Sequence, residues 1–139
     1  MGVSNNQLQI LWATAANKSV AATAVAISDA ISFSAGCVTA AITLKADNEG
    51  TPANGDTVDF YSLVTCGDPD AVEDVADEYG AVKEHGEFLA QLNTYGTSFD
   101  PAVSTVYLQV GKAVKILAKS NAAANAITVS ACINEKVVS

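Results

Sequence analysis

The sequence predicts an all-β fold: a single β-sandwich of about eight strands with one long acidic loop. Apolar and polar residues alternate with a period of two in several short runs, which is the pattern of a half-buried strand. Turn-forming residues separate these runs at short, regular intervals, as in sandwiches and barrels. Only 6% of the residues are aromatic, so we expect small side chains to fill the sheets. Strand counting does not separate a jelly-roll from an immunoglobulin-like variant.

The first third of the chain is the least regular part of the pattern. The whole chain, with 139 residues, is expected to be one domain spanning 1–139, and residues 1–6 are expected to be a flexible arm. Residues 7–14 alternate as a strand and carry Trp12, the only tryptophan, as a core or interface anchor. Residues 18–34 predict two short strands, with a helix as the alternative because the segment is rich in alanine.

The remaining strands follow more regular alternation. Residues 37–46 form a strand that ends in a loop rich in Gly, Pro and Asn. We expect residues 56–65 to be its antiparallel partner, followed by strands around 88–92 and 106–110. Residues 114–118 and 127–133 predict a hairpin whose tip is SNAAANA. The stretches AAITLKADN and NAITVSACIN resemble each other, which indicates two strands in similar surroundings.

Nearly all the net charge lies in one connection. Between Gly67 and Glu87 the chain carries eight carboxylates and one lysine, which gives −7 of its total of −8. A divalent cation would use such oxygens, and the weak metal candidates are Asp68, Asp70, Asp74, Asp77 and Glu78. The spacing of a calcium-binding loop is missing, so a solvated loop is the favoured interpretation. His85, in the same segment, is expected to be an exposed loop residue.

Composition argues against several classes of function. The chain has seven Lys, no Arg and a negative net charge, so we expect no nucleic-acid binding. Cys37, Cys66 and Cys132 form no CxxC pair and are expected as free thiols, which fits a reducing cytoplasm. No run is long and apolar enough for a membrane span, and the N-terminus has no secretory pattern.

No motif in the sequence predicts catalysis. Phosphate-loop, GxSxG and HExxH patterns are missing, and the clustered carboxylates lack the apolar surroundings that raise a pKa for acid catalysis. We therefore expect no enzyme activity and no cofactor.

Several phrases of the sequence resemble small β-rich structural proteins from the virions of tailed bacteriophages. These are SDAISFS, NEGTPANGDTVDFYSL, GDPD followed by DEYG, EFLAQLNT and KILAKSNAAANAITVSACINE. They describe strands and turns rather than an active site. The resemblance implies a capsid decoration or cement protein, made in the host cytoplasm and located in the virion. A neck, tail or fibre component comes second.

This role implies particular partners and contacts. The resemblance implies the major capsid protein or other virion proteins as partners, and a homo-oligomer, with a trimer favoured. The mixed polarity of their strands makes Trp12, Tyr61, Leu63 and Tyr107 the interface candidates. A carbohydrate-binding or host-recognition β-sandwich is the alternative from another class.

Overall fold

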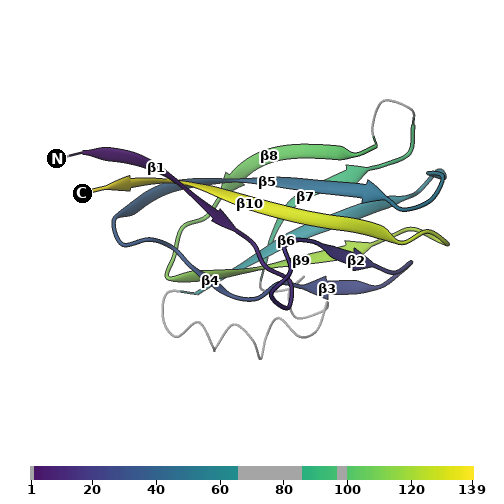
Figure 1. The fold of residues 1–139 in the computed structure, drawn as a ribbon, viewed down its shortest axis with the longest axis horizontal. Helices are drawn as coiled ribbons and strands as arrows, with labels where there is room; N and C mark the ends of the chain where they lie inside the picture. Colours follow the sequence, from purple (N-terminus) through teal and green to yellow (C-terminus); the bar gives the residue numbers. More distant parts are fainter. Residues whose placement is uncertain (1, 66–85, 97–99) are drawn as a thin grey trace.

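The computed structural model describes residues 2–65, 86–96 and 100–139 (Figure 1). Three predictions concern residues outside these ranges: the free thiol of Cys66, the acidic loop with its metal candidates, and the exposed position of His85. The described part contains ten strands and no helix, packed as a sandwich of two antiparallel sheets, so the predicted all-β sandwich is confirmed. The strands are β1 (Val3–Gln9), β2 (Lys18–Val20), β3 (Val25–Ile27), β4 (Ile31–Ser32), β5 (Cys37–Asn48), β6 (Thr57–Thr65), β7 (Glu87–Asn93), β8 (Ala102–Leu108), β9 (Ala113–Ser120) and β10 (Ile127–Val138).

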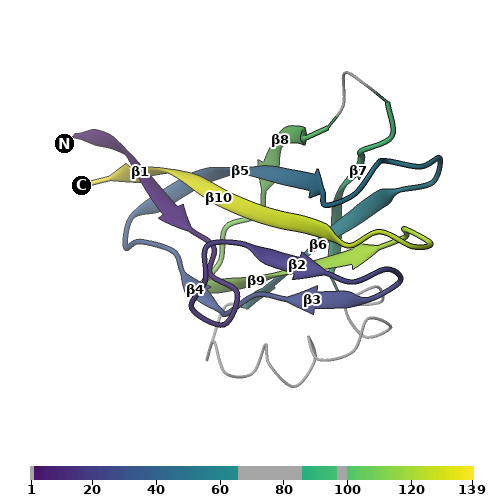
Figure 2. The same ribbon diagram turned by 45° about the vertical axis from the view of Figure 1, so that its right-hand side comes forward.

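Each sheet is built around two long central strands. In the β5–β10 sheet the order is β1-β10-β5-β8, and β2 pairs with the same edge of β10 as β1, further along the strand. In the β6–β9 sheet the order is β3-β9-β6-β7, with β4 also pairing with β9. Figure 2 shows β2 of one sheet lying beside β3 of the other, at an edge where the two sheets approach each other.

Two pairing predictions are wrong. The strand at 56–65 does not pair with the strand at 37–46, because β6 pairs with β7 and β9 in the opposite sheet. The last two strands are not a hairpin either, since β9 pairs with β6 while β10 pairs with β5. Alternation shows which residues face inward but does not identify a partner. In a sandwich, successive strands often cross to the other sheet.

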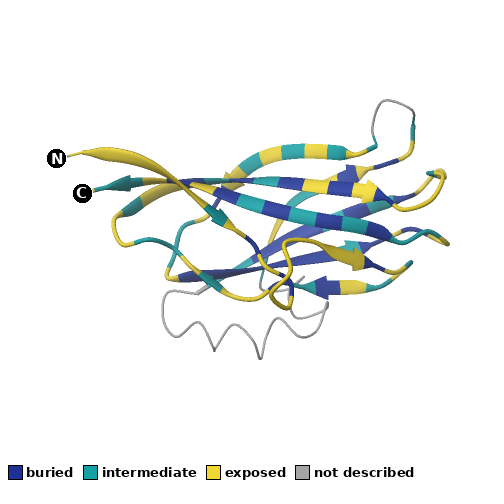
Figure 3. Cartoon of the chain, in the orientation of Figure 1, coloured by how far each residue is buried: buried dark blue, intermediate teal, exposed yellow. Residues whose placement is uncertain are grey.

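The N-terminal predictions also need correction. Residues 18–34 contain three short strands, β2, β3 and β4, and the helix alternative is wrong. The first strand begins and ends earlier than the predicted range of 7–14, because β1 covers Val3–Gln9 and residues 10–14 lie outside it. Strand β1 pairs over its full length with the C-terminal half of β10, so residues 3–6 are not a flexible arm. Most of β1 is exposed, because this ladder runs past the end of the core, and so its sequence shows no apolar alternation (Figure 3).

The core lies between the sheets and is made from the inward-facing side chains of both. From β5 these include Ile42 and Leu44, and from β6 Val58 and Phe60, all fully buried. Strand β9 is buried on both faces: Ile116 packs inside, and Leu117 belongs to a smaller apolar cluster on the outer side. Among the described residues, no helix is long and apolar enough to cross a membrane.

Candidate functional site

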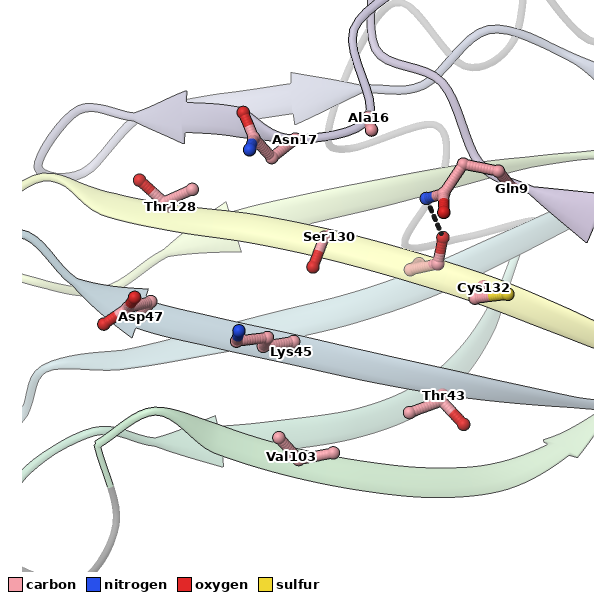
Figure 4. Close-up of a pocket in the computed structure, with 11 residues that line it drawn as sticks. Gln9, Ala16, Asn17, Thr43, Lys45, Asp47, Val103, Thr128, Ser130 and Cys132 are labelled. Carbon is pink, nitrogen blue, oxygen red and sulfur yellow. Dashed lines mark hydrogen bonds between the residues drawn. The ribbon is translucent and has the colours of Figure 1, made fainter.

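The outer face of the β5–β10 sheet contains a hollow of about 420 Å³ (Figure 4). Strands β5 and β10 form its floor. The loop before β2 forms one wall and β8 the other. The volume lies within the range of roughly 300–1,000 Å³ that is usual for ligand pockets. The lining residues are Gln9, Ala16, Asn17, Thr43, Lys45, Asp47, Val103, Thr128, Ser130, Ala131 and Cys132.

Strand register explains why polar side chains gather there. Lys45 lies opposite Ser130, and Asp47 lies opposite Thr128, in the β5–β10 ladder. Residues two apart on a strand share a face, so all four side chains point away from the core. Within the described part of the chain, none of these four makes a side-chain hydrogen bond. They are therefore open to a ligand or a partner.

Two other lining residues are held in place. The Gln9 side-chain amide donates to the carbonyl of Ala131 at 2.9 Å, which fixes it across β10. The hydroxyls of Thr43 and Thr105 lie 2.8 Å apart and join β5 to β8. Fixed side chains at the edge and open ones at the centre give this face a defined shape.

Strand β8, whose Val103 lines the hollow, exposes two apolar side chains. Val103 is 58% exposed and Tyr107 is 69% exposed, and both point outward with Thr105 between them. In the ladder Val103 lies opposite Lys45, and Tyr107 lies opposite Ala41. Polar groups next to an exposed aromatic and an exposed Val are a combination found at protein interfaces.

The four predicted interface residues do not come together. Trp12 is only 2% exposed and belongs to the core, where its indole N–H has no hydrogen-bond partner among the described residues. Tyr61 and Leu63 lie on the outer side of the β6–β9 sheet, where Tyr61 is mostly buried and stacks edge-on against Phe88. Of the four, Tyr107 alone is exposed, and it lies on the other sheet. Contact with a neighbouring subunit stays a prediction for all four.

A buried carboxylate joins the chain termini to the sandwich. Glu135 on β10 is 1% exposed. It accepts hydrogen bonds from the Asn6 amide at 2.9 Å, the Ser34 backbone N–H at 2.8 Å and the Ser34 hydroxyl at 2.6 Å. Burial alone would raise the pKa of Glu135, but these donors and the Cys37 thiol outweigh it, so its pKa is lowered. The carboxylate is a structural element of this end.

A second buried carboxylate organises the loops at the opposite end of the strands. Asp56 is 2% exposed and accepts from Asn48 at 2.9 Å, from the Ala53 N–H at 3.0 Å and from Asn125 at 3.2 Å. Burial acts to raise its pKa, and these hydrogen bonds overcome it, so the pKa of Asp56 is lowered. The loops that follow β5 and β9 are thereby tied to one group.

Neither carboxylate is arranged for catalysis. Each accepts three hydrogen bonds, and a carboxylate with a lowered pKa is a weak base. Cys37 and Cys132 are free thiols in the structure, as predicted. The pKa of Cys37 is raised by burial and by the neighbouring Glu135, which keeps that thiol protonated and less nucleophilic. In the described ranges, no three His, Cys, Asp or Glu side chains gather in a way that could hold a metal ion.

Sequence reasoning missed the hollow. Its open side chains belong to two strands that are more than 80 residues apart, as the pairs Lys45 with Ser130 and Asp47 with Thr128 show. The one available signal was the likeness between AAITLKADN and NAITVSACIN, because these two stretches are the paired central strands β5 and β10.

Comparisons with known proteins find similar folds only. Neither a family model nor a curated protein matches the chain. Among solved structures, the GH115 4-O-methyl-α-glucuronidase BtGH115A aligns at 11% identity and a TM-score of 0.47, over 94% of this chain and 16% of the enzyme. A carbohydrate-binding module of Cellvibrio mixtus lichenase 5A, in complex with cellotriose, aligns at 11% identity and 0.43, over 96% and 91%. The Mud Crab Dicistrovirus structure aligns at 9% and 0.41, over 98% and 67%. These likenesses show nothing about the function of this chain.

Proposed function

We propose that this chain is a non-catalytic structural protein of a phage virion, a capsid decoration or cement protein that docks on the assembled lattice. The observation that carries the proposal is the open outer face of the β5–β10 sheet. There, polar side chains that make no side-chain hydrogen bond within the described residues line the hollow together with Val103, and Tyr107 is exposed further along β8. The sequence resemblance to small virion proteins supports the same role, with the major capsid protein as partner. A place in the neck, tail or fibre is the next choice within this class.

The surface charge agrees with such a role. The β5–β10 face carries one lysine and one aspartate in its hollow, Lys45 and Asp47, so it has no net charge there. The chain as a whole has a net charge of −8. A neutral docking face on an acidic protein lets free copies repel one another while that face approaches a lattice.

The direct test is binding to expanded, undecorated capsids. We expect the purified protein to co-sediment with them and to raise their resistance to heat. Tyr107→Ser and Ser130→Arg, which change the rim and the centre of the face, should each weaken binding at least tenfold. Tyr95→Ser is the matched control, since Tyr95 is also exposed but lies in the loop after β7. Absence of co-sedimentation by the unaltered protein would refute the proposal.

The hollow itself favours a second candidate, a carbohydrate-binding module. Hydroxyl, amide, ammonium and carboxylate groups within one cavity of about 420 Å³ can hydrogen-bond to a polyhydroxylated ligand. Against it, the lining includes no aromatic ring for a sugar to stack on. Saturable binding on a glycan array that Ser130→Arg abolishes would favour this candidate. A blank array would leave the structural role.

A further inference from the structure

Strand β8 is an edge of its sheet, and β7 of the opposite sheet lies close to it. It pairs with β5 on one side, and among the described residues no strand pairs with its other side. Its seven residues, AVSTVYL, include no charge and no proline, and no register shift interrupts its ladder. Natural proteins commonly protect exposed edges with lysine, proline or a bulge, because free N–H and C=O groups can pair with another chain.

The other long edge strands differ from β8. Strand β7, at the edge of the β6–β9 sheet, carries Glu87, and its ladder with β6 has a register shift between Phe60 and Tyr61. Strand β1 presents a run of polar side chains that includes Asn5 and Asn6. Strand β1 also has a regular ladder, but Val3 is its one exposed large apolar side chain, whereas β8 exposes both Val103 and Tyr107.

The sequence of β8 is self-complementary when two copies run antiparallel. A two-fold axis at Thr105 pairs all seven residues of one copy with all seven of the other. On the outer face, Val103 then lies opposite Tyr107 of the second copy, Tyr107 lies opposite its Val103, and the two Thr105 side chains meet at the axis. Aromatic residues opposite β-branched residues, and Thr opposite Thr, are favourable cross-strand pairs.

We propose that two copies of this chain associate through β8, edge to edge about that two-fold axis. The two β5–β10 sheets then form one continuous sheet, and the two hollows lie on the same side of it. The interface is isologous, so it closes after two copies. This geometry gives a dimer where the sequence resemblance favoured a trimer. Because the dimer forms from the protein alone, it can fail while capsid binding holds, and the reverse.

Charge substitutions at Val103 and Tyr107 test the register. Sedimentation equilibrium on the unaltered protein, up to about 1 mM, should show a monomer–dimer equilibrium. Val103→Lys with Tyr107→Lys places like charges opposite each other across the axis and should weaken the dimer at least tenfold. The double variant Val103→Lys with Tyr107→Glu places a Lys opposite a Glu at both ends of the pairing. It should recover most of the dimer affinity that the Lys–Lys variant loses. Both side chains are exposed, so unchanged circular dichroism should verify folding in each variant.

The control is Val3→Lys, since Val3 is 68% exposed on β1, at the other edge of the same sheet. It should leave the dimer unchanged. Three results would each overturn the proposal: a protein that stays monomeric throughout, a trimer without a dimer, or equal weakening by the Lys–Lys and Lys–Glu variants. The last result would show that copies associate without this register.

Discussion

Replacing Glu135 by glutamine tests whether a buried carboxylate fastens the two chain ends to the sandwich. The Asn6 amide and the Ser34 hydroxyl both donate to Oε1, and the Ser34 N–H donates to Oε2. Glutamine keeps one acceptor oxygen but directs an NH₂ group at one of these donors. Hydrogen bonds to a charged group contribute roughly 1.5–3 kcal/mol each, so we expect a loss of about 2–3 kcal/mol in unfolding free energy. The melting temperature should fall by about 5–10 °C.

The same variant predicts a change in pH dependence. A carboxylate whose pKa is lower in the folded than in the unfolded chain stabilises the fold fully above the unfolded value. That contribution is lost as the pH falls through the folded pKa. The pKa of Glu135 is lowered from 4.5. The difference in unfolding free energy between the unaltered protein and Glu135→Gln should therefore be constant near neutral pH and shrink below about pH 4.5.

Urea unfolding between pH 7 and pH 3 measures both effects, with Glu49→Gln as the matched control. Glu49 is an exposed carboxylate bonded only to the Ser19 hydroxyl among the described residues, so its substitution should change stability by less than about 0.5 kcal/mol. Equal loss of stability in the two Gln variants would show that Glu135 does not fasten the chain ends. A Glu135→Gln difference in unfolding free energy that stayed the same down to pH 3 would show that the charge of Glu135 does not stabilise the fold.

Three further substitutions probe other parts of the fold by thermal and urea unfolding. Asp56→Asn should lower the unfolding free energy by about 2–3 kcal/mol, because three donors lose a charged acceptor; no change would mean that the loops hold together without it. Gly36→Ala should destabilise the fold far more than Gly55→Ala. Both glycines have a positive φ, but only at Gly36 would a Cβ meet a backbone atom, the Val138 oxygen at 2.3 Å. Equal losses of stability in the two variants would contradict this. Ser28→Ala should lose about 1–3 kcal/mol, because the buried Ser28 hydroxyl accepts from the Ile116 N–H; a loss under 0.5 kcal/mol would contradict it.

The sequence predicts the faces of the strands better than their partners. In β5 and β10 the alternation of Ile42 and Leu44 with Thr43, and of Val129 and Ile133 with Ser130, correctly identifies the inward residues. Alternation fails on β9, where Lys115 is 7% exposed despite its outward position, because that strand is covered on both faces.

Partner choice depends on contacts that a local pattern does not contain. The strands at 114–118 and 127–133 look like a hairpin, yet the loop between them crosses from one sheet to the other. The position of this loop is set by hydrogen bonds between residues far apart in the sequence. The Asn125 side-chain amide donates to the Asp56 carboxylate, and the Asn121 N–H donates to the Thr57 carbonyl. The hollow was unpredictable for the same reason, since its side chains meet only after β5 and β10 have paired.

The division between buried networks and open surface makes the functional proposals separable from folding. Glu135 and Asp56 stabilise the two ends through internal hydrogen bonds, whereas the side chains of Val103 and Tyr107 are more than half exposed. Exposed side chains away from such networks usually change stability by less than about 0.5 kcal/mol when they are replaced. A variant at β8 that loses association or lattice binding while it keeps its melting temperature therefore identifies an interface. A variant at Glu135 that loses binding only together with stability does not.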